Sequence, residues 1–178
     1  MPNKIKKWEE ISREIVFQKY SRKIEKVIYR LPDGKESDFY LKKEGPAVGI
    51  LALTKDKKVI LVRQYRPGPN EILNELPGGY IGENETPEQA AERELLEETG
   101  YKGKIKLVTT VFDCAYSTMK RYCMVASDCE KLAEQKLDKN EFAEIVLMSL
   151  DDFRELLRSG KMTDVEVGYL GLDYLGLL

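Results

Sequence analysis

Three glutamates in the middle of the chain have a spacing that suits metal chemistry. Glu94, Glu97 and Glu98 stand at i, i+3 and i+4, so on a helix their carboxylates share one face and point at the same volume. Like charges at this spacing repel by roughly 0.2–0.5 kcal/mol per pair. Such a face is therefore either well solvated or turned toward a cation, and hard carboxylate ligands suit Mg²⁺ or Mn²⁺.

The composition limits what these carboxylates can support. The chain has 178 residues and no histidine, which excludes Ser-His-Asp and Cys-His catalytic sites and any zinc site with an imidazole ligand. Its 29 Lys and Arg against 31 Asp and Glu give a formal charge of −2. This balance argues against nucleic acid as the main partner. An enzyme of this composition must use carboxylates, lysines, backbone groups or a hard metal ion.

The sequence also predicts where the protein works. The longest apolar run, Ala47–Leu53, is too short to span a membrane and suits a buried strand. The N-terminus lacks the apolar stretch of a signal peptide. Cys114, Cys123 and Cys129 form no CxxC motif and are interpreted as reduced, mostly buried thiols. We therefore expect a cytoplasmic protein with no membrane partner.

The glutamates lie on the clearest predicted helix. Thr86 is a good N-cap, Pro87 follows at the first helical position, and Gln89 completes a capping box. Leu95 belongs to an apolar stripe with two alanines, and Gly100 is a natural helix stop.

Other elements are predicted from apolar periodicity and turn residues. Residues 1–45 are expected to form an N-terminal β-appendage, whose hairpin needs a packing partner because a lone hairpin is marginally stable in water. From residue 46 the runs become more apolar. We expect strands at Lys23–Tyr29, Ser37–Leu41, Ala47–Leu53, Val59–Val62, Lys104–Phe112, Arg121–Ala126 and Glu144–Leu150, and helices at Asp152–Arg158 and Asp164–Leu178.

The full stretch around the glutamates reads Gly79-x5-Glu85-x7-Arg93-Glu94-Leu95-x-Glu97-Glu98-x-Gly100-Tyr101. It resembles the signature of the Nudix hydrolases, GX5EX7REUXEEXGU, in which U is a bulky aliphatic residue. Every fixed position is met, and only Tyr101 stands where an aliphatic residue is usual. The segments VRQYRP (62–67), ELPGG (75–79), ETGYKG (98–103) and SGKMTD (159–164) are similar to those of the ADP-ribose pyrophosphatase branch.

This resemblance implies a fold and an activity. The fold would be α+β, a Nudix α/β/α sandwich with a mixed β-sheet over residues 46–178. Residues 1–45 would add a β-hairpin region used in homodimerisation. The activity would be Mg²⁺-dependent hydrolysis of the diphosphate linkage in ADP-ribose or a related nucleoside diphosphate sugar. The products would be a nucleoside monophosphate and a sugar phosphate, and Mn²⁺ is a possible substitute for Mg²⁺.

The resemblance also assigns roles to individual residues. Glu94, Glu97 and Glu98 match the metal-binding glutamates, and the Gly78 carbonyl matches a backbone ligand. The structural residues of the motif are Gly79, Glu85, Arg93 and Gly100, with Glu85 and Arg93 forming a pair. A general base is expected in the acidic stretch 138–144: Glu141 is the candidate and Glu144 the reserve, with a glutamate of the signature helix as the alternative.

Substrate-binding residues are implied less specifically. Arg63 and Arg66 lie near the expected site and suit a phosphate clamp, although surface charges beside a Pro-rich loop are the competing interpretation. An aromatic residue of the N-terminal hairpin stacks on the base in this branch. Phe39 is the best positional match, with Tyr40 and Trp8 as rivals, and each of the three also suits core packing.

One departure from the branch affects the substrate. ADP-ribose pyrophosphatases usually carry a proline about sixteen residues beyond the signature, where this chain has Tyr116-Ser117. Another nucleoside diphosphate sugar is therefore a candidate. The remaining alternatives are a Nudix enzyme for nucleoside triphosphates or capped RNA, and a non-catalytic nucleotide-sugar sensor. The intact glutamate cluster argues against the sensor, and the N-terminal hairpin with VRQYRP argues for the sugar branch.

Overall fold

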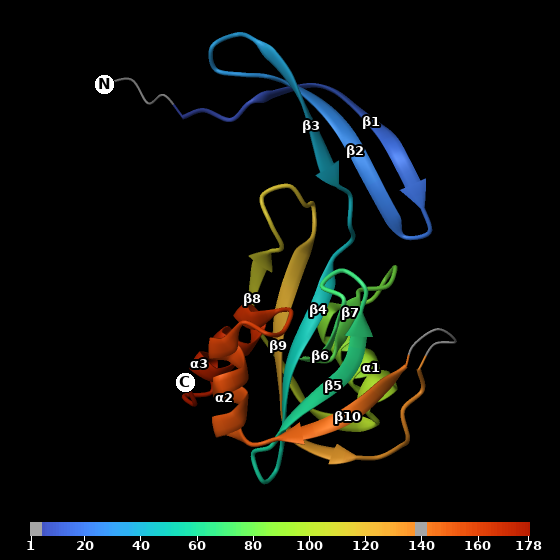
Figure 1. Ribbon diagram of the computed structural model, residues 1–178, viewed down its shortest axis with the longest axis vertical. Coiled ribbons are helices and arrows are strands. Elements are labelled where there is room, and N and C mark those ends of the chain that lie inside the picture. The colour runs from blue at the N-terminus through green and yellow to red at the C-terminus, as the bar shows by residue number, and fades with distance from the viewer. Residues whose placement is uncertain (1–4, 138–141) are drawn as a thin grey trace. The chain divides into compact units, whose positions relative to one another are not determined.

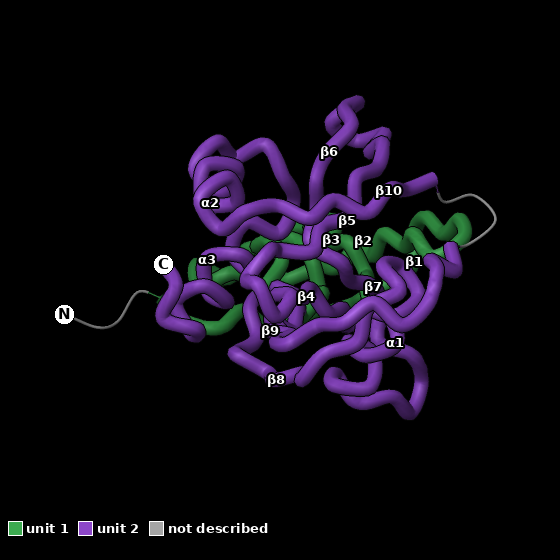
Figure 2. Tube along the Cα trace, turned by 90° about the horizontal axis from the view of Figure 1, so that it is seen from below, with its two compact units in different colours: residues 1–45, 112–120 green, residues 46–111, 121–178 purple. Residues whose placement is uncertain are grey.

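The computed structural model describes residues 5–137 and 142–178. The chain divides into two compact units (Figures 1 and 2). Unit 1 comprises residues 1–45 and 112–120, and unit 2 comprises residues 46–111 and 121–178. The grouping of residues 112–120 with the N-terminal segment has no signature in the sequence.

Unit 1 is built on a three-stranded antiparallel sheet. Its strands are β1 (Glu9–Lys19), β2 (Arg22–Arg30) and β3 (Glu36–Lys42), in the order β1-β2-β3. The sequence predicts only the last two. Strand β1 carries register shifts between Glu10 and Ser12 and between Ile15 and Phe17. Because each bulge shifts the two-residue alternation, β1 lacks the periodicity by which strands are recognised.

Unit 2 contains a mixed sheet in the order β10-β5-β4-β9-β8, with β6 paired to β5 and β7 paired to β4. Strands β4 and β9 run parallel, whereas β5 pairs antiparallel with β4, β6 and β10. Strands β4 and β5 pair at only two residue pairs, and β7 pairs with the start of β4. The strands are β4 (Ala47–Thr54), β5 (Val59–Arg66), β6 (Glu71–Glu75), β7 (Gly78–Tyr80), β8 (Tyr101–Phe112), β9 (Lys120–Lys131) and β10 (Ala143–Met148).

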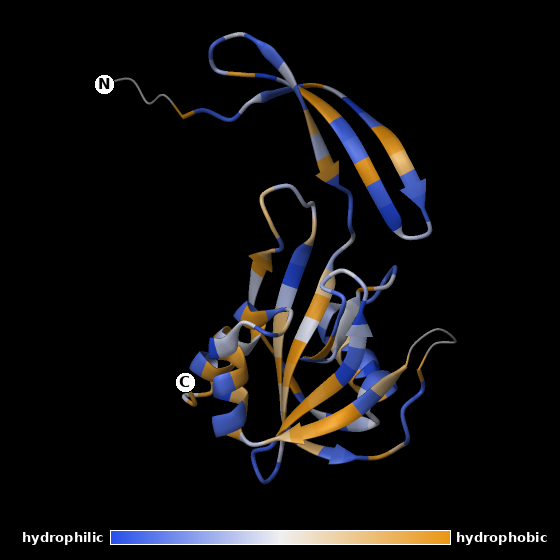
Figure 3. Cartoon of the chain, viewed as in Figure 1, coloured by the Kyte–Doolittle hydropathy of each residue, from blue (hydrophilic) through white to orange (hydrophobic). Residues whose placement is uncertain are grey.

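Helices cover both faces of this sheet, which confirms the predicted α/β/α sandwich. The helices are α1 (Pro87–Thr99), α2 (Leu150–Ser159) and α3 (Val165–Tyr174). Along β4, Ile50 packs in a core with α1 and Leu51 packs in a core with α2 and α3, as strand alternation requires. Strand β4 and the first half of β5 are apolar (Figure 3). Among the described residues, none of the helices combines the length and apolar character needed to cross a membrane.

Helix α1 begins and ends as predicted. The Thr86 hydroxyl accepts the Gln89 N–H at 3.2 Å, and the Gln89 side chain accepts the Thr86 N–H at 2.9 Å. Gly100 ends the helix with φ +73°, a conformation that favours glycine. Leu95 is buried against the sheet with the two alanines of the same stripe. This burial fixes the rotation of the helix and so the direction of its glutamates.

Candidate active site

A cavity of about 440 Å³ in unit 2 holds the predicted glutamates. It brings together the start of β7, one face of α1 and the segment after β9. The lining residues are Gly78, Gly79, Tyr80, Arg93, Glu94, Glu97, Glu98, Lys136 and Leu137. The structure therefore gathers six residues of the predicted site around one volume.

Arg93 connects the glutamates of this cavity to a neighbouring loop. Its Nε and Nη2 donate to the two oxygens of Glu85 at 2.9 and 3.0 Å, and Nη2 also donates to the Tyr80 carbonyl at 3.0 Å. Its Nη1 donates to Glu94 at 2.8 Å and to Glu97 at 3.2 Å. These acidic partners raise the pKa of Arg93 above its usual value. Arg93 thus forms ion pairs with two carboxylates of the cluster.

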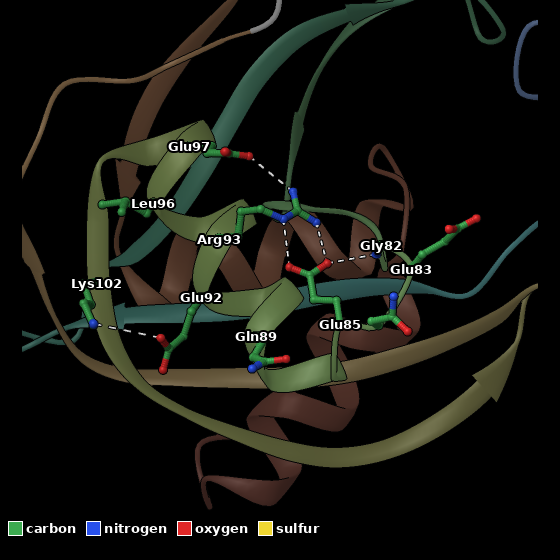
Figure 4. A pocket seen from close by; sticks show the side chains of 10 residues that line it. Gly82, Glu83, Glu85, Gln89, Glu92, Arg93, Leu96, Glu97 and Lys102 are labelled. Carbon is green, nitrogen blue, oxygen red and sulfur yellow. Dashed lines mark hydrogen bonds and ion pairs between the residues drawn. The ribbon is translucent and has the colours of Figure 1, made fainter.

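Glu85 anchors the loop before α1. Its carboxylate accepts the bidentate Arg93 pair and the Gly82 N–H at 2.9 Å. The hydrogen bond from Arg93 has the largest effect, and together these donors hold the pKa of Glu85 below its ordinary value. Figure 4 shows the pair beside a second cavity of about 750 Å³, which Arg93 and Glu97 also line. The predicted structural role of the pair is consistent with this geometry.

The two glycines of the cavity allow the carboxylates to approach the backbone. The Gly78 N–H donates to Glu98 Oε2 at 2.9 Å. A Cβ on Gly79 would lie 2.3 Å from Glu94 Oε1, and one on Gly78 would lie 2.3 Å from the Val48 carbonyl oxygen. Gly79 therefore leaves space for a functional side chain, whereas Gly78 leaves space for a neighbouring strand.

The segment 132–137 covers the C-terminal end of α1. The Lys136 N–H donates to the Glu97 carbonyl at 2.8 Å, and the Gln135 side chain donates to the Glu98 carbonyl at 2.6 Å. Gly100 also accepts two backbone bonds, from Leu132 and Ala133. Helix ends leave carbonyls unpaired, and this segment satisfies them. No motif in the sequence marks it, because most of these bonds come from the backbone.

The NUDIX domain family model matches residues 43–166, which include every residue that lines the cavity. The chain belongs to the Nudix hydrolase family. It is similar to the ADP-ribose pyrophosphatase of Bacillus subtilis (strain 168), with 34% identity over 83% of this chain and 80% of that protein. It is also similar to the methanol dehydrogenase activator of Bacillus methanolicus, with 26% identity over 94% of this chain and 91% of that protein.

A solved structure shares the fold. The crystal structure described as ADP compounds hydrolase matches 99% of this chain and 100% of its own, with a TM-score of 0.80 and 21% identity. The comparison supports the Nudix architecture independently of close sequence similarity. The expectation of a Nudix fold, drawn from the signature, is thereby confirmed.

Nudix hydrolases generally use divalent metal ions, and the donors in this cavity fit one. Glu94, Glu97 and Glu98 carry hard carboxylate oxygens, and they line the cavity together with Gly78. Within the described ranges, no three Cys, Asp or Glu side chains are placed close enough to hold an ion as they stand. Glu94 and Glu97 each accept a hydrogen bond from Arg93 Nη1.

Arg66 is fixed by a buried carboxylate. Its Nε donates to Glu75 Oε2 at 2.7 Å, and Glu75 is only 1% exposed. Glu75 also accepts Gln64 at 3.0 Å and Thr163 at 2.7 Å. The buried Glu75 carboxylate thus has three hydrogen-bonding partners, which offset the free-energy cost of removing it from water. The sequence shows Glu75 only as part of the ELPGG segment and gives no sign of this role.

Arg63 and the reserve base lie together on neighbouring strands. Arg63 of β5 is paired in register with Glu144 of β10, and both line a cavity of about 700 Å³. Leu137 lines this cavity and the one with the glutamates. Neither Arg63 nor Arg66 is among the described residues that line the glutamate cavity. Glu141, the predicted general base, lies outside the described residues.

Phe39 belongs to an aromatic cluster within unit 1. Its ring centroid lies 5.1 Å from that of Trp8 and 5.9 Å from that of Tyr29. Tyr40 alternates to the other face of β3 and is 56% exposed. Two of the three aromatic candidates for base stacking, Phe39 and Trp8, therefore lie together, and Tyr40 lies apart from them.

Proposed function

We propose that this Nudix hydrolase catalyses Mg²⁺-dependent hydrolysis of the diphosphate linkage in ADP-ribose or a related nucleoside diphosphate sugar. The products are a nucleoside monophosphate and a sugar phosphate. The observation that carries the proposal is the cavity onto which Gly78, Glu94, Glu97 and Glu98 converge. The 34% identity to a protein named ADP-ribose pyrophosphatase supports this choice of substrate.

The residues of the cavity have distinct roles in this proposal. Glu94, Glu97, Glu98 and the Gly78 carbonyl would hold Mg²⁺, or Mn²⁺ in its place. Such an ion supplies charge neutralisation of the diphosphate and lowers the pKa of the attacking water. Arg93, which Glu85 holds in place, orients Glu94 through their ion pair. Glu97 and Glu98 would thus contribute to catalysis as ligands of that ion.

Arg63 and Arg66 would bind the phosphates of the substrate. The Glu75 carboxylate holds Arg66 Nε at 2.7 Å, so its guanidinium loses little conformational freedom when it binds an anion. A guanidinium also matches phosphate geometry through paired N–H donors. Arg63 lines the neighbouring cavity, where it is available to the other end of an extended substrate.

Glu141 is the proposed general base, and Glu144 remains the reserve. The anchoring of segment 132–137 on α1 supports this assignment, because it ties the chain just before Glu141 to the metal-binding helix. A general base would accept the proton of the attacking water. Glu141→Gln should then lower kcat more strongly than Glu144→Gln. The reverse order would assign the base to Glu144.

We further propose that Phe39 stacks on the base of the substrate. Base stacking on aromatic rings contributes about 1–3 kcal/mol per base.

We also propose that the protein is a homodimer. The apolar side chains Ile15, Val16 and Phe17 of β1 are 46–53% exposed. An exposed apolar row on an edge strand is typical of an association surface.

The experiment that tests this function measures phosphate release, after coupling to a phosphatase, from a panel of substrates. The panel contains ADP-ribose, ADP-glucose, GDP-mannose and UDP-glucose, with nucleoside triphosphates as controls, each with and without Mg²⁺. We expect Mg²⁺-dependent turnover of a diphosphate sugar above that of the triphosphates. Binding of a diphosphate sugar without turnover would favour a sensor, and preference for a triphosphate would place the enzyme in another branch.

A further inference from the structure

The segment SGKMTD (159–164) connects α2 to α3 and is held firmly on both sides of Thr163. On one side, Met162 is buried in the core that α2 and α3 share. On the other side, the Asp164 carboxylate pairs with Arg121 Nη1 of β9 at 2.7 Å. The backbone at Thr163 is therefore fixed to the body of unit 2, and its hydroxyl is presented from a constant place.

The Thr163 hydroxyl holds one oxygen of a buried carboxylate. It donates to Glu75 Oε1 at 2.7 Å, whereas Glu75 Oε2 accepts Arg66 Nε at 2.7 Å and Gln64 Nε2 at 3.0 Å. Among the described residues, Thr163 supplies the donor to Oε1, and strand β5 supplies the donors to Oε2. Because Glu75 is only 1% exposed, solvent contributes little to holding this carboxylate. The Thr163 hydroxyl therefore sets the orientation in which Glu75 meets Arg66.

Arg66 keeps part of its guanidinium available. Its Nε is bound by Glu75 and its side chain is 46% exposed. Within the described ranges, neither Nη1 nor Nη2 of Arg66 has a hydrogen-bond or ion-pair partner. Arg93 differs, because all three of its nitrogens donate to neighbouring groups. A guanidinium held at Nε still offers its Nη donors to the oxygens of a phosphate.

We propose that Thr163 is a positioning residue for phosphate binding, and that it acts on Arg66 through the buried Glu75. The inference rests on the proposed function, in which Arg66 binds a phosphate of the substrate. Thr163 bonds to neither the substrate nor a metal ion in this account. It fixes the Glu75 carboxylate, and Glu75 in turn fixes the direction in which the Nη groups of Arg66 point.

Binding of inorganic diphosphate isolates this role from catalysis. Calorimetric titration of the full chain in EDTA measures diphosphate affinity without turnover and without a metal ion. We expect the parent chain to bind diphosphate and Arg66→Ala to lose most of that affinity. Thr163→Val removes the hydroxyl and should weaken binding about threefold to tenfold, within the range of coupling in one hydrogen-bond network. Thr163→Ser keeps a hydroxyl and should retain most of the affinity.

A second threonine provides the matched control. Thr54 is 7% exposed, and its hydroxyl donates to the Asp56 carboxylate at 2.7 Å, the same distance as in the pair of Thr163 and Glu75. Thr54→Val should lower Tm, because it removes a comparable hydrogen bond, and should leave diphosphate affinity unchanged. An equal loss of affinity in Thr54→Val would overturn the proposal, since general destabilisation would then explain both variants.

The path through Arg66 is tested by combining substitutions. When Arg66→Ala is already present, Thr163→Val should have no further effect on binding, because a positioning residue acts only through its partner. An equal effect of Thr163→Val in both backgrounds would leave Thr163 with a purely structural role. Thr163→Ala removes the same hydroxyl and replaces Thr163→Val in the cycle if valine beside a carboxylate is not tolerated.

Kinetics connect this contact to the substrate. Thr163→Val should raise KM for the diphosphate sugar by the same factor and leave kcat nearly unchanged, because Thr163 lies outside the described lining of the glutamate cavity. A fall in kcat at constant KM would contradict the proposal. If diphosphate binding depends on Thr163 and Arg66 but no diphosphate sugar is hydrolysed, the proposed function fails and the positioning role stands. Hydrolysis of a diphosphate sugar with diphosphate binding indifferent to Thr163 would have the opposite meaning.

Discussion

At the scale of single residues, Gly79 shows how the backbone makes room for a functional carboxylate. A Cβ at this position would lie 2.3 Å from Glu94 Oε1. Because the Glu94 side chain is flexible, Gly79→Ala should displace the Glu94 carboxylate and leave the backbone fold unchanged. We expect turnover to fall by roughly a hundredfold, as for a small misplacement of a catalytic group, with an unchanged Tm.

The neighbouring glycine provides the control for this prediction. A Cβ on Gly78 would lie 2.3 Å from the Val48 carbonyl oxygen, and backbone of a buried strand cannot move aside. Gly78→Ala should therefore lower Tm as well as turnover. Full Mg²⁺-dependent activity in Gly79→Ala would show that Glu94 is not held where the account requires it.

The cysteines allow a second test at this scale. Burial raises the pKa of the Cys123 and Cys129 thiols to about 11 in each case, whereas Cys114 is exposed. A raised pKa keeps both buried thiols protonated at pH 8, and the thiolate is the reactive form. Titration with a disulfide reagent at pH 8 should modify one thiol in the native protein and three in denaturant. Rapid modification of all three in the native protein would contradict their burial.

At the scale of elements, helix α1 is where sequence and structure agree most closely. Its capping box, its terminal glycine and its apolar stripe are local signals, and each appears in the structure as predicted. The signature residues follow from the same local geometry. Segment 132–137 could not be predicted in this way, because its bonds to Glu97 and Gly100 join residues distant in sequence through backbone groups. Strand β1 was missed because bulges break its alternation.

The Glu85–Arg93 pair gives a pH-dependent prediction for the loop before α1. Arg93 lowers the pKa of Glu85, so the pair stabilises the folded state above the ordinary carboxyl pKa. This contribution is lost as the pH falls through the folded-state pKa of Glu85. Glu85→Gln should therefore be less stable than the parent chain at pH 7. The difference should shrink toward pH 3.

Urea unfolding at both pH values measures this difference as a free energy of unfolding. Glu83→Gln is a suitable control, because Glu83 lies in the same loop and lines the same cavity as Glu85. A gap between Glu85→Gln and the parent chain that does not change with pH would mean that the ion pair contributes nothing specific.

At the scale of the whole molecule, the signature establishes most of unit 2 and much less of unit 1. The family match begins at residue 43, and the apolar runs of unit 2 predict its buried strands. Unit 1 takes residues 112–120 from the middle of the chain. The contacts that bring them there, around Lys42, Glu44 and Tyr116, combine backbone bonds with a buried carboxylate. Neither the backbone bonds nor the buried carboxylate produces a local pattern in the sequence.

The proposed homodimer is a further prediction at this scale. Light scattering of the full chain should give twice the protomer mass of 20.5 kDa. Ile15→Lys combined with Phe17→Lys should shift the protein toward the monomer, because both side chains are about half exposed on β1 and a charge disfavours burial in an interface. A protomer mass for the unmodified chain at micromolar concentration would contradict the proposal.

The most direct test of the central claim compares the parent chain with Glu97→Gln, using ADP-ribose and a Mg²⁺ titration. Chromatography follows the appearance of AMP and ribose 5-phosphate. Glutamine keeps the size of Glu97 but removes a charged metal ligand. The account predicts Mg²⁺-dependent formation of both products by the parent chain and a loss of about a hundredfold in the variant, the scale expected when one stabilising group is removed. Equal Mg²⁺-dependent rates for the two proteins would contradict the placement of the metal site on α1.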